Sequence, residues 1–262
     1  MNNVLVLDCS SGMSGDMFLS TMVDLGVPHE YLQSRLALLG LEGYRLEIKS
    51  VTRCGVQALS INVVLDDPQA AKTNPYSGNY RNYRQIREMI DSSGLDEEEK
   101  RIAQKIFLIK TGAESVAHGV PPEEVRFHEA GAVDSIVDIV GAAICLAYLK
   151  PTRVVSNFPP TGYGEVHCAC GTLSVPVPAV REIIRQTGLP HYRSDIPQEI
   201  LTPTGAAILA GIVDEFIESI PGDVPEQSAG RGTGTRDTGL PPMKAVLSCD
   251  EKENQKCLNQ GD

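Results

Sequence analysis

The sequence predicts a mixed α/β (α+β) fold, organised as a single large domain of the catalytic type with one loop region rich in glycine and proline. A short apolar strand, a Gly/Ser loop and an amphipathic helix open the chain, an alternating hairpin follows, and helical stripes dominate the remainder. A length of 262 residues with 42% hydrophobic positions supplies enough apolar side chains for a large core. This composition excludes a disordered or collagen-like chain.

Apolar periodicity defines the elements of the first quarter of the chain. Unbroken apolar runs indicate buried strands, spacings of three and four indicate helices, and strict alternation indicates half-buried strands. The expected elements are a strand over 4–7, helices over 17–25 and 31–39, and an antiparallel hairpin of 44–51 with 56–65. Residues 66–80 are rich in Pro, Asn, Ser and Gly, which indicates a surface loop able to act as a lid.

The same criteria apply to the rest of the chain. The expected helices cover 83–91, 97–118, 133–147, 179–186 and 205–217, and the expected strands cover 124–127, 153–158 and 244–248. Residues 159–178 are rich in proline and glycine and indicate an irregular functional loop. Because residues 249–262 are polar, we expect a domain over 1–248 followed by a disordered tail.

Charge and cysteine content exclude several classes of function. The formal net charge is −11, so the chain lacks the basic surface that binds a nucleic-acid backbone. No segment approaches the roughly 20 apolar residues of a membrane span. Seven cysteines, an odd number without regular spacing, indicate a reducing compartment. We therefore expect a cytoplasmic enzyme or binding protein.

The segment Asp8-Cys9-Ser10-Ser11-Gly12-Met13-Ser14-Gly15-Asp16 lies between the first expected strand and helix. Loops at this position bind ligands in open α/β sheets, and glycines let backbone N–H groups approach an anion. The pattern equally fits a tight turn in which Asp16 interacts with the helix dipole. Two aspartates, a cysteine and three hydroxyls favour a metal or phosphate site.

A second candidate site begins at Phe127-His128-Glu129 and continues into the next helix. Asp134 and Asp138 are four residues apart, so they share one helix face. Either aspartate alone would more simply be a surface or dipole partner. Together with the adjacent His-Glu pair, they favour a divalent-metal or acid/base site.

Three shorter segments complete the candidates. His167-Cys168-Ala169-Cys170 offers imidazole and thiol groups to a metal such as nickel or zinc, or simply places small cysteines in a core. Thr202-Pro203-Thr204 fits a helix cap. Gly230 to Asp237 contains two arginines among glycines, which indicates either a phosphate or carboxylate clamp or a flexible turn.

These segments, in this order, resemble the LarC-type nickel insertion protein family over about residues 1–247. The resemblance rests on DCSSGMSGDM from Asp8, FHEAGAVDSIVDIVG from Phe127, LTPTGAAIL from Leu201 and GTGTRD from Gly232. It implies that Ni(II) is inserted into pyridinium-3,5-bisthiocarboxylic acid mononucleotide, in a CTP-dependent cyclometallation of the lyase class. The product would be the nickel-pincer cofactor of lactate racemase.

The resemblance also implies roles for the candidate residues. We expect the mononucleotide-binding residues to be Ser10, Ser11, Gly12, Ser14, Gly15, Thr204 and Arg236. The expected catalytic residues are His128, Glu129 and Asp16, and the expected nickel ligands are Asp8, Asp134, Asp138 and Cys168. Weakly binding carboxylates suit a metal that has to be released to thiocarboxylates.

The sequence departs from the family pattern at three places. Arg126 and Cys170 stand where the family usually has histidines, and the family's histidine-rich stretch is replaced around Pro75 to Asn79. Full members also continue into a second domain associated with CTP and a divalent cation.

The expected partners are the precursor, a separate C-terminal half, apo lactate racemase and further copies of the chain. The alternative is a non-catalytic nickel chaperone or subunit that needs that C-terminal half.

Overall fold

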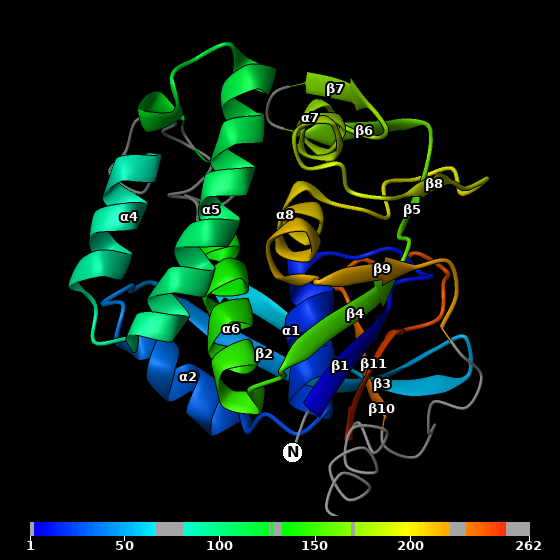
Figure 1. Ribbon diagram of the computed structural model, residues 1–262, viewed down its shortest axis with the longest axis horizontal. Helices are drawn as coiled ribbons and strands as arrows, with labels where there is room; N and C mark the ends of the chain where they lie inside the picture. Colours follow the sequence, from blue (N-terminus) through cyan, green and yellow to red (C-terminus); the bar gives the residue numbers. More distant parts are fainter. Residues whose placement is uncertain are drawn as a thin grey trace, which may run out of the picture.

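The computed structural model describes residues 3–66, 81–125, 127, 133–168, 171–220 and 229–249. Residues 67–80 of the loop expected over 66–80, the His128-Glu129 pair and the tail beyond residue 249 lie outside the described residues. Within the described part, the chain combines helices and strands in a mixed α/β arrangement, as predicted (Figure 1).

Seven strands of the described chain form one mixed sheet in the order β2-β3-β10-β11-β1-β4-β9. Their bounds are β1 Asn3–Asp8, β2 Tyr44–Arg53, β3 Val56–Leu65, β4 Arg153–Asn157, β9 Glu215–Ile217, β10 Ala229–Thr233 and β11 Met243–Cys249. Strand β1 runs parallel to β4 and antiparallel to β11. The sequence of β1 alternates fully and partly buried residues, so only one of its faces contributes to the core.

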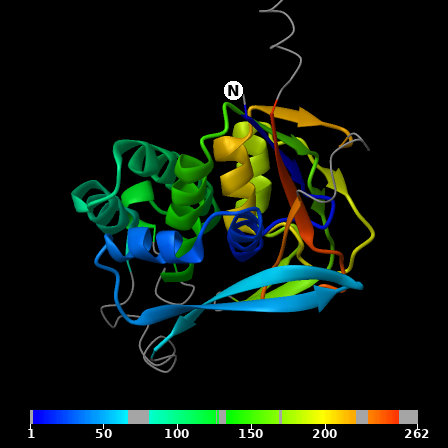
Figure 2. The ribbon, with the colours of Figure 1, turned by 90° about the horizontal axis from the view of Figure 1, so that it is seen from below.

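The predicted hairpin is confirmed. Tyr44 pairs with Leu65, and the register continues to Arg53 opposite Val56. Cys54 and Gly55 form the two-residue turn with φ of 49° and 78°, the positive values that a tight hairpin requires. Figure 2 shows this long ribbon running beneath the helices.

The helices gather on one side of the sheet, with α1 packed across β10, β3 and β11 (Figures 1 and 2). Their bounds are α1 Gly15–Asp24, α2 His29–Ala37, α4 Tyr83–Ser92, α5 Glu97–His118, α6 Val133–Leu149, α7 Pro178–Thr187 and α8 Pro203–Ile212, with a short 3-10 turn at Pro122–Glu124. Helix α4 begins with a capping box between Asn82 and Gln85. Gly119 ends α5 in the left-handed conformation that favours glycine.

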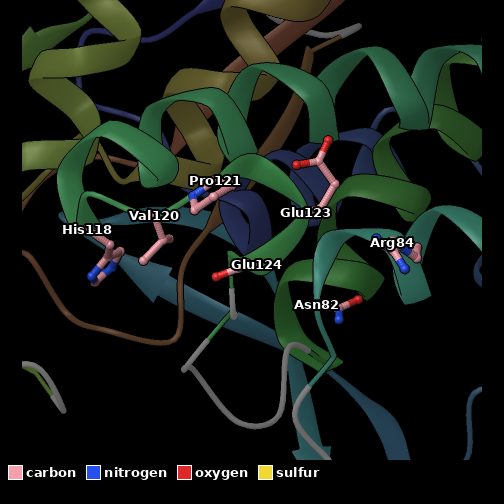
Figure 3. A pocket seen from close by; sticks show the side chains of 7 residues that line it. All are labelled: Asn82, Arg84, His118, Val120, Pro121, Glu123 and Glu124. Atoms are coloured by element: carbon pink, nitrogen blue, oxygen red, sulfur yellow. The ribbon is translucent and has the colours of Figure 1, made fainter.

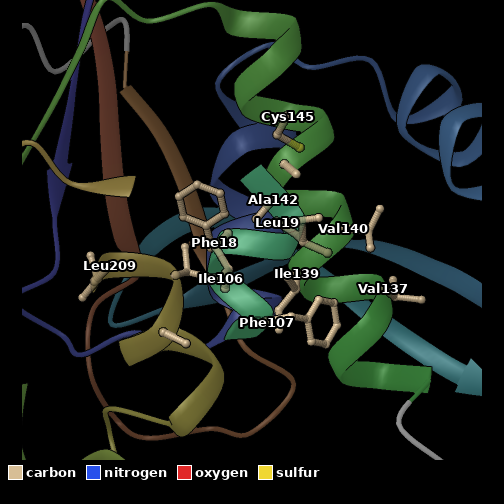
Figure 4. Packing of buried hydrophobic residues seen from close by; sticks show 14 of the residues in the cluster. Phe18, Leu19, Ile106, Phe107, Val137, Ile139, Val140, Ala142, Cys145 and Leu209 are labelled. Carbon is tan, nitrogen blue, oxygen red and sulfur yellow. The ribbon is translucent and has the colours of Figure 1, made fainter. Parts of the chain in front are cut away.

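The core lies between α1, α5, α6 and α8 (Figure 4). Phe18 of α1, Phe107 of α5, Val140 of α6 and Leu209 of α8 are all buried there. Helix α6 is apolar on nearly all sides, as expected for a helix enclosed by others. Its mid-helix Gly141 permits close contact, since a Cβ there would lie 2.8 Å from Leu19 Cδ2.

Four local predictions were wrong. Residues 122–124 form a 3-10 turn rather than a strand at 124–127, because the N–H groups of Glu124 and Val125 donate back to the carbonyls of Pro121 and Pro122. The helix expected over 205–217 ends at Ile212, and β9 follows. Just before β9, Asp214 accepts a hydrogen bond from the Val154 N–H at 2.8 Å. The segment 229–233 is a strand of the main sheet.

The fourth correction concerns the segment over 159–178, which is not wholly irregular. Strand β5 (Pro160–Thr161) pairs with β8 (Tyr192–Arg193), and β6 (Glu165–Cys168) forms a hairpin with β7 (Gly171–Ser174). Proline and glycine content concealed these short pairings.

Two buried thiols predict a pH-dependent loss of stability. Burial raises the pKa of Cys9 to about 12 and also raises the pKa of Cys145. Above about pH 9 the unfolded chain loses these protons while the folded chain keeps them, so the free energy of unfolding falls as pH rises. The expected slope is about 1.4 kcal/mol per pH unit for each thiol.

Urea unfolding of wild type and Cys145→Ala between pH 9 and 10.5 measures this effect. The free energy of unfolding should fall less steeply with pH in Cys145→Ala than in wild type, because one of the two buried thiols is missing. The control Cys54→Ser removes an exposed thiol and should follow wild type. Equal slopes for all three proteins would contradict the assignment.

Candidate functional site

A cavity of about 560 Å³ lies where the amino-terminal ends of α1, α6, α7 and α8 meet. We call it the central cavity. Its polar lining consists of Ser11, Ser14, Asp16, Lys110, Glu114, His118, Asp134, Ser135, Asp138, Glu199, Thr202, Thr204, Thr235, Arg236 and Thr238. Helix amino ends carry partial positive charge and free N–H groups, so their convergence favours an anionic ligand.

The loop after β1 reaches this cavity through close backbone packing. The Met13 N–H donates to the carbonyl of Ile200 at 2.8 Å, and the Thr202 N–H donates to the carbonyl of Met13 at 3.1 Å. Gly12 has φ +83°, and a Cβ there would lie 2.1 Å from the Ile200 carbonyl oxygen. Gly12 therefore packs the loop against the segment before α8 rather than facing the cavity.

Asp138 is buried and lines the central cavity beside the start of α1. A Cβ on Gly15 would lie 2.1 Å from Asp138 Oδ2, so glycine at position 15 gives this carboxylate its room. Asp134 lines the same cavity from the first turn of α6. The predicted common face of the two aspartates thus faces a cavity.

Asp16 holds the loop after β10. Its carboxylate accepts hydrogen bonds from the backbone N–H groups of Met17 at 2.9 Å and Thr235 at 2.8 Å, and from the Ser14 hydroxyl. Since the next residue, Arg236, also lines the cavity, Asp16 positions one cavity wall against α1. The Arg236 guanidinium in turn donates to the carbonyl of Glu199 at 2.5 Å.

Sequence reasoning missed a polar face on α5. Lys110, Glu114 and His118 follow one another at intervals of four and all line the central cavity. Glu114 and His118 lie 3.4 Å apart (Oε2 to Nε2). The spacing is present in the sequence, but the helix expected over 97–118 was not among the predicted sites.

Lys110 is only 4% exposed. Its Nζ donates to the hydroxyls of Ser135 at 2.6 Å and Thr204 at 2.9 Å and lies 5.4 Å from the centre of the Phe127 ring. No carboxylate oxygen of the described chain lies within 4 Å of this ammonium group. The central cavity therefore contains a buried positive charge held by neutral partners.

The lining charges of the described residues are unequal. Five acidic side chains (Asp16, Glu114, Asp134, Asp138 and Glu199) meet two basic ones (Lys110 and Arg236). The carboxylates suit a cation, while Lys110 and the helix amino ends suit an anion. The site can thus accept a metal ion and an anionic molecule together.

Three predicted residues lie elsewhere in the described chain. Asp8, Ser10 and Gly12 do not contribute to the described lining of the central cavity. Asp8 Oδ1 accepts hydrogen bonds from the N–H and hydroxyl of Ser10, and Asn157 Nδ2 donates to Ser10 Oγ at 2.8 Å. These contacts join the carboxyl ends of β1 and β4.

The hairpin that carries Cys168 borders the central cavity. Val166 of β6 and Leu173 of β7 line it, although the Cys168 side chain lies outside the description. Among the described residues, no three His, Cys, Asp or Glu side chains form a group that could hold a metal. The predicted nickel ligand set, with His128 and Glu129 nearby in sequence, therefore stays a prediction.

A second hollow of about 880 Å³ lies on the other side of His118, between the end of α5 and the start of α4 (Figure 3). Arg84, Glu123 and Glu124 line it together with His118. Because His118 lines both spaces, it lies on the wall between the central cavity and this hollow.

The fold and the cavity define an α/β protein with a charged cavity, whose lining has the chemistry to suit a cation and an anion. Within the described residues, no helix is long and apolar enough to cross a bilayer. The sequence profile of the nickel insertion protein family matches residues 5–260. The chain belongs to this family.

Individual relatives agree with the profile. The chain is 41% identical to a pyridinium-3,5-bisthiocarboxylic acid mononucleotide nickel insertion protein of Alkaliphilus metalliredigens, covering 90% of this chain and 58% of the relative. Proteins of the same name from Geobacillus kaustophilus and Staphylococcus epidermidis are 39% and 37% identical, each covering 98% of this chain and 62% of the relative. The chain thus spans about three fifths of these relatives. No solved structure matches it significantly.

Proposed function

We propose that this chain takes part in inserting Ni(II) into pyridinium-3,5-bisthiocarboxylic acid mononucleotide, and that the central cavity binds both. The observation that carries the proposal is the meeting of Asp134 and Asp138 with Lys110 and four helix amino ends in one cavity. The carboxylates match the Ni(II) substrate, and the positive groups match the negatively charged mononucleotide. Family membership supports the same pairing.

The chemistry assigns a task to each group. Insertion forms one nickel–carbon and two nickel–sulfur bonds, and a ring proton leaves as its carbon electron pair passes to nickel. That proton needs a base. Glu114 and His118, paired at 3.4 Å in the cavity, are candidates beside the sequence-predicted His128 and Glu129. Val166 and Leu173 supply an apolar wall that limits access of water.

The reaction class, the CTP dependence, the location and the partners are proposed from the family resemblance. We propose a cytoplasmic nickel chelatase of the lyase class that depends on CTP with a divalent cation and supplies lactate racemase. A C-terminal half would complete the reaction, and the subunit would assemble with further copies of itself. Activation of apo lactate racemase by precursor, Ni(II) and CTP, with and without such a half, separates this enzyme from a non-catalytic nickel chaperone.

Equilibrium dialysis against Ni(II) tests the metal site. We expect Asp134→Asn plus Asp138→Asn to weaken Ni(II) binding at least tenfold, because both carboxylates line the central cavity. The charge-matched control is Asp91→Asn plus Asp195→Asn, two exposed residues away from the cavity lining. Equal affinities and stoichiometries for wild type and both variants would rule out the proposed metal site.

A further inference from the structure

Lys110 presents a feature that nickel binding does not explain. It lies in the middle of α5 and is only 4% exposed. It lines a cavity rich in carboxylates, yet its ammonium group forms no ion pair within the described chain. A buried ammonium ion costs several kcal/mol unless its charge is compensated. Such a group is expected where a ligand supplies the missing negative charge.

The neighbours of Lys110 match an oxyanion in both geometry and chemistry. An ammonium group has three donors, and two of them are occupied by the Ser135 and Thr204 hydroxyls. Each hydroxyl accepts from Lys110 and so keeps its own proton for an acceptor in the cavity. The three groups lie on α5, α6 and α8, which fixes them relative to one another.

Helix α8 adds backbone donors at the same point. Pro203 and Thr204 begin the helix, and Thr202 caps it by accepting from the Gly205 N–H at 3.1 Å. Thr204 lies in the first turn, where backbone N–H groups have no acceptor within the helix. A helix start beside a lysine and two hydroxyls is the arrangement that binds phosphate in many proteins.

Aspartates line the central cavity next to this group. Asp138 follows Ser135 by three residues on α6, and it lies beside the start of α1, where a Cβ on Gly15 would be 2.1 Å from its Oδ2. A molecule bound with its phosphate at Lys110 would therefore extend toward the aspartates, where nickel is proposed to bind.

We propose that Lys110, with the hydroxyls of Ser135 and Thr204 and the amino end of α8, binds the phosphate monoester of the mononucleotide. This assignment rests on the proposed function and adds to it the orientation of the substrate. Lys110 and Thr204 thereby fix one end of the molecule, and the pyridinium ring lies toward Asp138.

Isothermal titration calorimetry with two matched probes tests the assignment. Nicotinic acid mononucleotide and nicotinic acid riboside differ only in the phosphate, and both carry a pyridinium carboxylate. We expect wild type to bind the mononucleotide at least tenfold more tightly, and inorganic phosphate to compete with it. Lys110→Met should abolish this preference and the competition while leaving the riboside affinity unchanged.

Controls separate the phosphate site from folding and from nickel binding. Lys105→Met removes an exposed lysine of the same helix and should retain the full preference. Thr204→Val should reduce the preference partly, and Ni(II) dialysis reports whether each variant retains its folded metal site.

A preference for the mononucleotide that survives in Lys110→Met would overturn the assignment. Equal wild-type affinities for the two probes would also overturn it. So would an equal loss of affinity for the mononucleotide and the riboside in Lys110→Met, since that result would place the pyridinium carboxylate, not the phosphate, at Lys110. Wild-type Ni(II) binding that still depends on Asp134 and Asp138 would leave the proposed function standing in each case.

Discussion

Gly232→Ala is expected to lower the free energy of unfolding by about 3 kcal/mol, at the upper end of the range for overpacking a core. Gly232 lies in β10, between Leu59 of β3 and Met243 of β11. Helix α1 crosses this strand so closely that a Cβ on Gly232 would lie 2.2 Å from the backbone nitrogen of Thr21. The backbone oxygen of Met17, also in α1, would lie 2.6 Å from this Cβ, so a change of rotamer cannot relieve the contact.

Helix α1 has no room to retreat from β10. Phe18 and Leu19 anchor it in the core on its other side, and both are fully buried. The same helix begins with Gly15 and Asp16 at the central cavity, so its displacement would also weaken Ni(II) binding. Both effects are expected from a single added methyl group.

Urea unfolding monitored by circular dichroism measures the loss. Gly94→Ala is the matched control, because a Cβ there meets its nearest atom, Leu38 Cδ2, at an ordinary 3.5 Å. We expect the control to lie within 1 kcal/mol of wild type, on the order of a surface substitution. A Gly232→Ala protein as stable as the control would show that α1 and β10 are not in close contact.

The same segment shows why the sequence did not predict β10. Glycines at positions 230 and 232 lower the β-propensity of the run, so its pattern indicated a flexible turn or an anion clamp. Glycine is required at both positions by tertiary packing, since a Cβ on either one would lie within 2.5 Å of α1 atoms. No local pattern contains the identity of the helix that packs on a strand.

Within the site, local periodicity predicted what lies on one element. The interval of four between Asp134 and Asp138 placed both on one face, and the structure places both in the central cavity. Lys110 shows the limit of that reasoning. Its interval of four to Glu114 was visible, but its burial depends on Ser135 and Thr204, which lie 25 and 94 residues away.

Glu99→Ala is expected to cost about 3–5 kcal/mol, the loss typical of breaking a buried ion pair by removing one partner. Glu99 is fully buried in the first turn of α5 and accepts a hydrogen bond from Arg35 Nε at 3.0 Å and a second from Nη2. The bond to Glu99 raises the pKa of Arg35 further above its usual range. Glu99 also accepts from the Asp96 N–H at 2.8 Å, which completes a capping box.

The neighbouring Glu98 supplies the control. It pairs with Arg101 one turn along the exposed side of α5, so Glu98→Ala should cost at most about 1 kcal/mol. Thermal unfolding of both variants at neutral pH and low salt gives the comparison. Similar losses for Glu98→Ala and Glu99→Ala would contradict a special role for the buried pair.

The double variant Arg35→Met plus Glu99→Met separates two contributions to stability. One is the net stabilisation by the ion pair, and the other is the cost of leaving one buried charge without its partner. Removing Glu99 alone leaves the Arg35 guanidinium, 18% exposed, with only Asp96 at 3.2 Å. Replacing both charges by methionine leaves no uncompensated ion and keeps apolar contact between α2 and α5. We therefore expect the double variant to be more stable than Glu99→Ala, short of wild type by about the 1 kcal/mol of the lost cap. A double variant less stable than Glu99→Ala would mean that the attraction between the two charges exceeds their desolvation cost.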